Sequence, residues 1–428
     1  MSSGPSKLNL VFADSKGTIL DYDGLHMAGC SAGIFCNPSM EELIELPEGS
    51  ELFVLPSRLP VGLEPDTLEP ALLDTNPYAP GETIQAVAAF MAPAHTAVYT
   101  AAYQTIGDDA PLLPLFAYTA VGWRDGKFYV AAFRSDADIR QDPVQFDQER
   151  INRKTWKKLQ QYPDNRLIQH LGKCCLTYAC PAARNLFLNR WEAPLPCSPT
   201  CNASCVGCIS LQPSGCCRST QDRIRFVPSP TEIAEIAISH LETAPKPVVS
   251  FGQGCEGEPL LQAETMQRAI ERIRAGTDKG TINLNTNGSL PDAVERLADA
   301  GLDSIRISIN SAQLKYHGRY YNPRGFDFSD VRRSIKIMKS HGRHVSLNYF
   351  ILPGFTDDQE EFSALCKLIS AERPDLIQLR NLNMDPEYYL RSIDFLPAGP
   401  AMGMMNWHRE LKQQFPWLRF GYFNPALQ

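Results

Sequence analysis

The feature that most constrains the fold is a regular alternation of short apolar runs and helical patterns in the C-terminal part of the chain. Helix starts are signalled by a capping box at Ser229 and Glu232, with Pro230 at the first helical position, and by a second box at Thr356 and Gln359. The apolar runs predict six strands, at 193–197, 246–252, 281–286, 304–310, 344–351 and 375–381. Strands that alternate with helices indicate an α/β fold of parallel βα units, in an open sheet or a barrel.

Polar side chains on one face of these strands bear on the choice between a sheet and a barrel. In the fourth strand Arg306, Ser308 and Asn310 alternate with isoleucines, and the third strand carries Asn283 and Asn285 in the same way. Strands of an open parallel sheet, covered by helices on both sides, are usually apolar throughout. We therefore predict a partial (β/α)6 TIM-like barrel with a polar lumen that holds a ligand, the alternative being a sheet with one face in water.

Shifts in composition predict how the rest of the chain is organised. The first part is rich in strand patterns, with a hairpin expected around Asp125 and Gly126. The predicted segments are a β-rich domain at 1–140, a helical connector at 141–190, the barrel at 191–386 and a C-terminal helix and strand extension at 387–428. The role of the β-rich domain does not follow from its residues.

Charge and hydropathy restrict the partners and the compartment. A net charge of −7 argues against nonspecific contact with nucleic acid. The first residues lack the charged start and apolar core of a signal peptide, and no stretch resembles a membrane span, so we predict a cytoplasmic protein without a membrane partner. In a reducing compartment, clustered cysteines bind metals more often than they form disulfides.

Six of the thirteen cysteines fall between Cys197 and Cys217, directly after the first predicted strand. Three of them form a C-x3-C-x2-C motif, at Cys201, Cys205 and Cys208. A loop at this end of a barrel is where βα enzymes carry their chemistry. One short loop can hold an Fe–S cluster through three thiolates and leave one iron for another ligand. A zinc site that includes Cys205 and Cys208, and inert buried thiols, are the alternatives.

Four further motifs follow the cysteine motif in order. The second lies in VVSFGQGCEGEPLL, around Gly257 and Glu258, and the later ones are INLNTNGSL, IRISINSA and VSLNYFILPGFTDD. Together with the cysteine motif, this series resembles the radical S-adenosylmethionine (radical SAM) superfamily. The resemblance covers about residues 193–386. One departure is Gly207, which stands where that family usually has an aromatic residue near the adenine.

This resemblance implies an enzyme, an oxidoreductase or a transferase, with a [4Fe–4S] cluster on Cys201, Cys205 and Cys208. The free iron would chelate S-adenosylmethionine (SAM), and an electron donor such as flavodoxin or ferredoxin would reduce the cluster. SAM would then be cleaved to a 5′-deoxyadenosyl radical, which abstracts hydrogen from a small molecule, a peptide or a protein. The implied SAM contacts are Gly257, Glu258, Asn287, Ser308, Asn310 and Asn348.

Two further hypotheses accompany this interpretation. Cys216 and Cys217 closely follow the main motif and are the best candidates for ligands of a second Fe–S cluster. The alternative function is a non-catalytic Fe–S or zinc sensor or scaffold on a degenerate barrel. The intact motif around Gly257 and Glu258 favours the enzyme, because a scaffold needs no SAM site.

Overall fold

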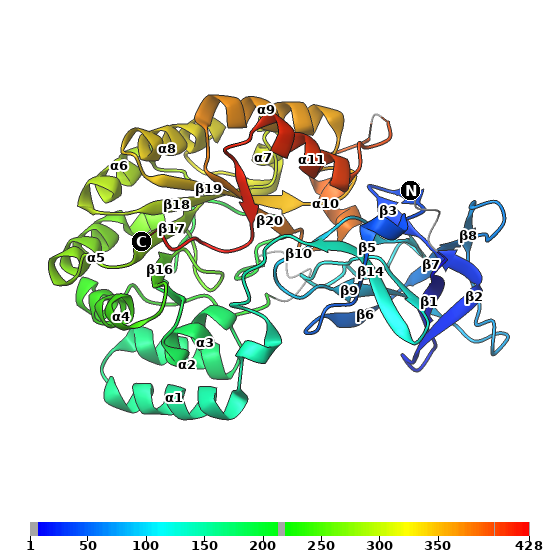
Figure 1. The fold of residues 1–428 in the computed structure, drawn as a ribbon, viewed down its shortest axis with the longest axis horizontal. Helices are drawn as coiled ribbons and strands as arrows, with labels where there is room; N and C mark the ends of the chain where they lie inside the picture. The colour runs from blue at the N-terminus through cyan, green and yellow to red at the C-terminus, as the bar shows by residue number, and fades with distance from the viewer. Residues whose placement is uncertain (1–6, 213–218, 398, 428) are drawn as a thin grey trace.

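The computed structural model describes residues 7–212, 219–397 and 399–427. An N-terminal β unit lies beside a curled parallel sheet, and three helices connect the two (Figure 1). The helices of the second unit lie along the outside of its sheet, and the concave side of the sheet faces inward (Figure 1). The predicted α/β class with a TIM-like partial barrel is therefore confirmed.

The N-terminal unit is built from antiparallel strand pairs. Its strands are β1 (Asn9–Ala13), β2 (Ile19–Met27), β3 (Gly29–Ser31), β4 (Ile34–Cys36), β5 (Leu43–Glu45), β6 (Glu51–Leu55), β7 (Arg58–Leu63), β8 (Pro70–Leu72), β9 (Gln85–Phe90), β10 (His95–Ala97), β11 (Thr100–Ala101), β12 (Tyr103–Thr105), β13 (Val121–Arg124) and β14 (Lys127–Arg134). The main sheet follows the order β10-β14-β13-β1-β2-β7-β12. Asp125 and Gly126 join β13 to β14 with φ values of 51° and 80°, as a two-residue hairpin requires. The predicted hairpin is present.

The half barrel forms a single parallel sheet in chain order. Its strands are β15 (Glu192–Pro194), β16 (Val248–Phe251), β17 (Thr281–Thr286), β18 (Ser304–Ile309), β19 (His344–Ile351), β20 (Leu376–Asn381) and β21 (Arg419–Gly421). The connecting helices are α1 (Gln148–Gln161), α2 (Arg166–Leu176) and α3 (Pro181–Leu188). The remaining helices are α4 (Pro230–Thr243), α5 (Ala263–Gly276), α6 (Pro291–Ala300), α7 (Leu314–Tyr321), α8 (Phe328–Ser340), α9 (Gln359–Glu372), α10 (Pro386–Ile393) and α11 (Met404–Gln414), and the short 3-10 helices are η1 (Met40–Glu42), η2 (Pro143–Gln145) and η3 (Pro259–Gln262).

A seventh strand, β21, extends the six that the sequence predicts. It comes from the C-terminal tail and pairs in parallel with β20, with Arg419 opposite Leu376 and Gly421 opposite Gln378. The sequence predicts a helix and a strand in this extension, but it does not predict that the strand joins the barrel sheet, because pairing with a distant strand leaves no local pattern. The division of the chain into four domains stays a prediction.

The polar face of the sheet is buried in the lumen. Asn283, Asn285 and Gln378 are all buried, which excludes the alternative of a sheet face in water. Asn424, from the tail after β21, fills part of this space. Its Oδ1 accepts a hydrogen bond from Gln378 Nε2 (2.9 Å), and its Nδ2 donates to Glu192 Oε1 (2.7 Å) and Asn285 Oδ1 (3.2 Å). The tail therefore closes the polar interior through side-chain hydrogen bonds.

The N-terminal unit docks on the loops that follow β19 and β20. Arg58 and Asp385 form an ion pair of 2.8 Å in which both side chains are only 2% exposed. Asn381 donates to the His95 carbonyl (3.0 Å) and accepts from the Ala97 N–H (2.9 Å). Because these loops lie at the carboxyl ends of the strands, the N-terminal unit covers the end of the barrel where such folds place their sites.

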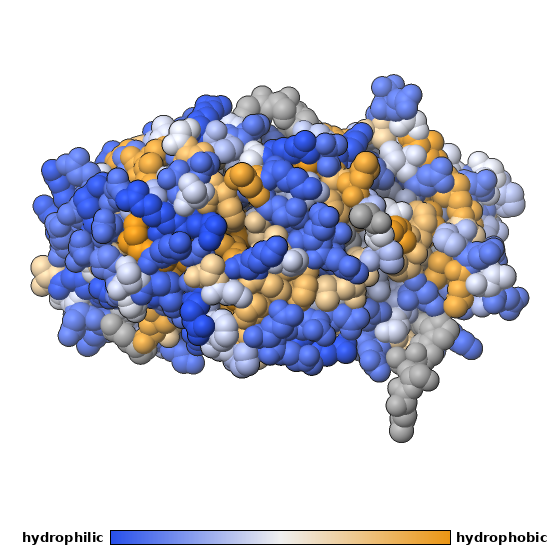
Figure 2. Space-filling view, turned by 90° about the horizontal axis from the view of Figure 1, so that it is seen from above, coloured by the Kyte–Doolittle hydropathy of each residue, from blue (hydrophilic) through white to orange (hydrophobic). Residues whose placement is uncertain are grey.

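Hydrophilic side chains are spread over the face shown in Figure 2, and apolar side chains gather in patches between them. Within the described ranges, none of the helices combines the length and the apolar character needed to cross a lipid bilayer.

Candidate active site

The cysteine loop follows β15 at the carboxyl end of the sheet. Ser204 N–H donates to the Tyr321 carbonyl (2.9 Å), and Val206 N–H donates to the Tyr320 carbonyl (3.0 Å). These bonds hold the loop against the last turn of α7, which follows β18. The three motif thiols are all half-buried, at Cys201, Cys205 and Cys208.

The thiols of the cysteine loop are close enough to affect one another. Burial first, and then the charges of Cys208 and Cys201, raise the pKa of the Cys205 thiol. Arg223 reaches the same group, with Nη2 at 3.5 Å from Cys208 Sγ and Nε at 3.1 Å from Ser210 Oγ. Arg223 thus places a positive charge beside the motif thiols. Sequence analysis did not identify Arg223, because this residue lies outside the motif, fifteen residues after Cys208.

A turn after β16 is joined to the cysteine loop by its backbone. Gly257 N–H donates to the Ser198 carbonyl (2.7 Å), and Glu258 N–H donates to the Thr200 carbonyl (2.8 Å). A Cβ at Gly257 would lie 1.9 Å from the Thr200 oxygen, so a side chain cannot fit without movement of the loop. The glycine therefore allows the first two motifs to lie against each other.

Glu258 is directed into the protein and is fully hydrogen-bonded. One carboxylate oxygen accepts from Leu260 N–H (2.9 Å) and from the Thr286 hydroxyl, and the other accepts from Asn287 N–H (2.9 Å). Burial raises the pKa of this carboxyl to about 7, against the effect of these donors. Glu258 thus connects the turn to the end of β17, and its predicted contact with SAM stays a prediction.

A second buried carboxylate, Glu256, has a similar bridging position. It accepts hydrogen bonds from the N–H groups of Cys197 (2.7 Å), Ser198 (2.9 Å) and Gln253 (2.6 Å). Burial raises its pKa to about 7. Glu256 comes directly before Gly257 in the second motif, and its hydrogen bonds fix where the cysteine loop begins.

Asn287 is hydrogen-bonded to Asn202 of the cysteine loop, a residue that sequence analysis did not identify. Its Nδ2 donates to Asn202 Oδ1 (3.0 Å), and Asn202 Nδ2 donates to Ser289 Oγ (2.9 Å). Asn202 lies directly after Cys201, so the end of β17 and the cysteine loop are held together by side-chain amides. The only sequence signal for Asn202 is its position inside the motif.

The three other predicted SAM contacts lie within or directly after β18 and β19. Asn348 Nδ2 donates to Ser308 Oγ (3.1 Å), and Asn310 Nδ2 donates to the Tyr389 hydroxyl (3.1 Å). The Oδ1 atoms of Asn310 and Asn348 are buried without a hydrogen-bond partner. A buried acceptor without a partner costs free energy, so these two atoms are positions where a ligand can donate hydrogen bonds.

Two arginines add positive charge to the lumen. Arg306 Nη1 donates to Gln378 Oε1 (3.0 Å), and Arg380 Nη2 donates to the Tyr422 carbonyl (2.7 Å). Neither forms an ion pair with a carboxylate among the described residues. Burial, together with the charge of Arg380, lowers the pKa of Arg306 to about 9. Buried charges are usually paired, so this lumen suits an anionic group.

The space opposite Gly207 is occupied by side chains from α7 and from the loop after β20. A Cβ at Gly207 would lie 2.8 Å from Met384 Sδ and 3.2 Å from the Tyr320 hydroxyl oxygen. The position that is usually aromatic in the family is thus covered by a tyrosine from α7 and a thioether from the loop after β20. Cys216 and Cys217, predicted as ligands of a second cluster, lie outside the described residues.

The parallel half barrel and the cysteine loop at the carboxyl ends of its strands are the features of a βα protein that binds a metal or cofactor on the inner side of the sheet. The family model of the radical SAM superfamily matches residues 195–366. Residues 195–366 thus form a domain of the radical SAM superfamily. Membership implies a [4Fe–4S] cluster and SAM, and it supports an enzyme rather than a non-catalytic scaffold.

Curated relatives match part of this chain. A region of 177 residues is 27% identical to the FeMo cofactor biosynthesis protein NifB of Klebsiella pneumoniae, over 38% of this chain and 37% of that protein. A region of 110 residues is 36% identical to an uncharacterized protein of Methanocaldococcus jannaschii, over 24% of this chain and 35% of that protein. The match thus spans little more than a third of each relative.

Solved structures also resemble part of the chain. Methylornithine synthase (PylB) is 13% identical, covers 57% of this chain and 68% of its own, and has a TM-score of 0.39. SuiB of Streptococcus suis, bound to the precursor peptide SuiA, is 14% identical, covers 63% of this chain and 54% of its own, and has a TM-score of 0.39. The overlap is therefore partial.

Proposed function

We propose that the protein is a radical SAM enzyme that acts on an organic substrate, with Cys201, Cys205 and Cys208 as the three ligands of its [4Fe–4S] cluster. The observation that carries the proposal is the pair of backbone hydrogen bonds from Gly257 and Glu258 to the cysteine loop. They bring the turn predicted to bind SAM against the loop predicted to bind the cluster.

The spacing of the thiols supports a cluster over a single ion. Ligands of a tetrahedral zinc ion lie about 3.8 Å apart when the Zn–S bonds are about 2.3 Å. The three motif thiols, all in the described part of the chain, do not form a group in which every sulfur lies within 4.8 Å of the others. A cubane cluster is a larger object than one ion and needs more widely spaced thiolates.

The chain's own residues would bind and orient SAM. The Oδ1 atoms of Asn310 and Asn348 offer two buried acceptors for ribose hydroxyls or amino groups. Glu258 and Asn287 would hold the turn and the cysteine loop in register, so that the amino end of SAM meets Gly257. The charge of Arg306 would receive a carboxylate, either of SAM or of the substrate.

The N-terminal unit would keep water out of the site. It covers the loops after β19 and β20, and Leu115 belongs to the same apolar cluster as Tyr320 and Tyr389, against which Cys205 is packed. When bound, the cluster supplies the electron that cleaves SAM and so yields a 5′-deoxyadenosyl radical able to abstract hydrogen. Exclusion of water protects such a species from side reactions. The electron would come from a protein donor such as a reduced flavodoxin or ferredoxin, and the substrate would be a small molecule or a peptide.

The test is a product assay under anaerobic conditions. The purified protein, reconstituted with iron and sulfide, is incubated with dithionite and SAM, and the products are separated by chromatography. We expect equal amounts of methionine and 5′-deoxyadenosine, with about four irons per chain at this site. A fully loaded cluster that yields no 5′-deoxyadenosine, even with candidate substrates, would refute the proposal.

Replacing Gly257 with alanine is expected to lower 5′-deoxyadenosine formation by about 100-fold, because displacement of a site by 1 Å has an effect of that size. The new Cβ would start 1.9 Å from the Thr200 oxygen, so the turn and the cysteine loop must separate. The initial rate at saturating SAM measures this effect.

Gly318→Ala is the matched control. Gly318 lies in α7, and a Cβ there meets nothing within 4 Å. We expect an unchanged rate and a gain in stability of about 0.5–1 kcal/mol, because alanine favours a helix over glycine. Equal rates in the two variants would show that the close approach at Gly257 is unimportant.

A further inference from the structure

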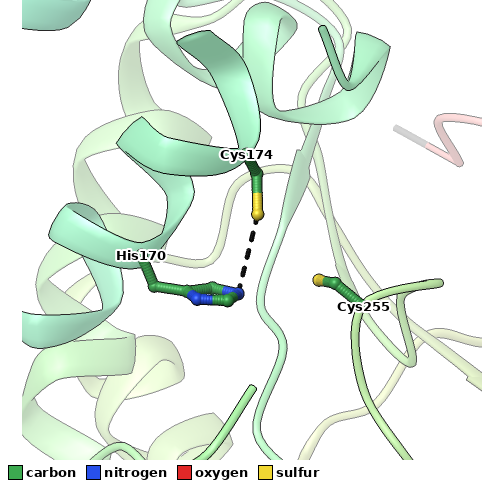
Figure 3. Close-up of side chains that lie close together, drawn as sticks. All are labelled: His170, Cys174 and Cys255. Carbon is green, nitrogen blue, oxygen red and sulfur yellow. Dashed lines mark hydrogen bonds between the residues drawn. The ribbon is translucent and has the colours of Figure 1, made fainter. Parts of the chain in front are cut away.

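A second group of potential metal ligands lies away from the cysteine loop, where α2 meets the loop after β16. His170 and Cys174 are one turn apart on α2, and Cys255 comes from the facing loop (Figure 3). Their ligand atoms all lie within 4.8 Å of one another, the one such set found in the ranges that the structure describes. The three side chains point toward a common space between them (Figure 3).

The distances suit one ion. His170 Nε2 lies 3.6 Å from Cys174 Sγ. Zinc bound tetrahedrally at about 2.1 Å from nitrogen and about 2.3 Å from sulfur separates two such ligands by about 3.6 Å. An Fe–S cluster is usually held by four thiolates, whereas this set has two thiols and one imidazole. The composition and the compactness therefore both favour a mononuclear site.

The surroundings hold these ligands in place. Cys174 is 2% exposed and Cys255 is 6% exposed, so neither thiol is available for bulk solvent chemistry. The His170 ring lies edge-on to Phe226, with ring centroids 6.2 Å apart, which restricts its rotation. Residues i and i+4 on a helix face the same side, as two ligands of one ion require.

We propose that His170, Cys174 and Cys255 bind a structural zinc ion, distinct from the cluster on the cysteine loop. The ion would join the helical connector to the loop that continues into Glu256 and Gly257. It would thereby stabilise the position of the turn that lies against the cysteine loop. Three protein ligands leave the fourth tetrahedral position for a water molecule or another thiol.

Metal analysis of the anaerobically purified protein tests this site. We expect an equimolar amount of zinc in the wild-type protein, in addition to iron. His170→Ala, Cys174→Ser and Cys255→Ser should each lose the zinc and keep the iron. In contrast, Cys201→Ala should lose iron and keep zinc, so the two sites can fail independently.

Cys175→Ser is the matched control. Cys175 is the next residue on α2, is equally buried and contacts Thr155 Oγ1 at 3.4 Å through its sulfur. This variant should keep its zinc. Retention of zinc by all three ligand variants would overturn the proposal, as would loss of iron in place of zinc.

A measurement on the unmodified ligand set guards against variants that fail to fold. Wild-type protein stripped of zinc and loaded with Co²⁺ should show thiolate-to-cobalt charge-transfer absorption, which added zinc abolishes. A disulfide between Cys174 and Cys255 in the purified protein would refute the site. Cobalt-loaded protein that lacks thiolate-to-cobalt charge-transfer absorption would refute it as well.

Discussion

Alanine at any one of Cys201, Cys205 and Cys208 is expected to abolish 5′-deoxyadenosine formation. With two thiolates left on the loop, the cluster loses one of its three protein ligands, and iron at this site should fall from about four per chain to near zero. SAM would then have no reductant inside the lumen. Iron and sulfide analysis, together with the product assay, measures both effects in the same preparation.

Cys366→Ala serves as the control for this series. Cys366 lies on α9 and is half-buried like the motif cysteines, but it is far from them in the sequence and its Sγ contacts Gln414 Oε1 (3.2 Å). Its iron content and its activity should equal those of the wild-type protein. A motif variant with full iron content would place the cluster elsewhere and contradict the proposed ligand set.

Arg58→Ala is expected to lower the free energy of unfolding by about 3–5 kcal/mol, the usual cost of removing one partner of a buried ion pair. Asp385 would remain buried without its cation, although Leu113 N–H (3.1 Å) and Tyr388 N–H (3.1 Å) would still donate to it. Removal of the Arg58 side chain would also leave the Pro56 and Pro111 carbonyls without the donor that they share. Anaerobic denaturant titration measures the change.

The exposed pair of Lys127 and Glu45 gives the comparison. Both side chains are more than half exposed, so Lys127→Ala should cost no more than about 1 kcal/mol. Replacing both members of the buried pair, as Arg58→Met with Asp385→Leu, should recover part of the loss, because no unpaired charge then remains. A cost for Arg58→Ala as small as that for Lys127→Ala would show that the N-terminal unit does not depend on this contact.

Local sequence patterns predicted most of the half barrel. The strands at 281–286 and 344–351 have the predicted bounds, and the capping box at Ser229 and Glu232 is present. These features depend on neighbours along the chain, so a periodicity or a cap signal is enough to find them. The polar strand faces likewise indicated a lumen, because polar side chains that alternate with apolar ones need a polar interior.

Competition between nearby capping residues explains a local error. Thr356 and Gln359 were expected to form a capping box, but α9 begins after Asp358, whose carboxylate accepts from Glu360 N–H and Glu361 N–H. The Thr356 hydroxyl instead accepts from Leu352 N–H (2.8 Å). Both residues are suitable caps, and the path of the preceding loop decided between them.

The sequence by itself therefore determined the order of the βα units, the polar side of their strands and the grouping of the cysteines on one loop. The tertiary structure alone decided which distant groups meet: Arg58 with Asp385, 327 residues apart, and Asn424 with Gln378 across the lumen. It also brought Cys255 to His170 and Cys174. Such contacts depend on how whole elements pack, which the pattern of any single segment does not record.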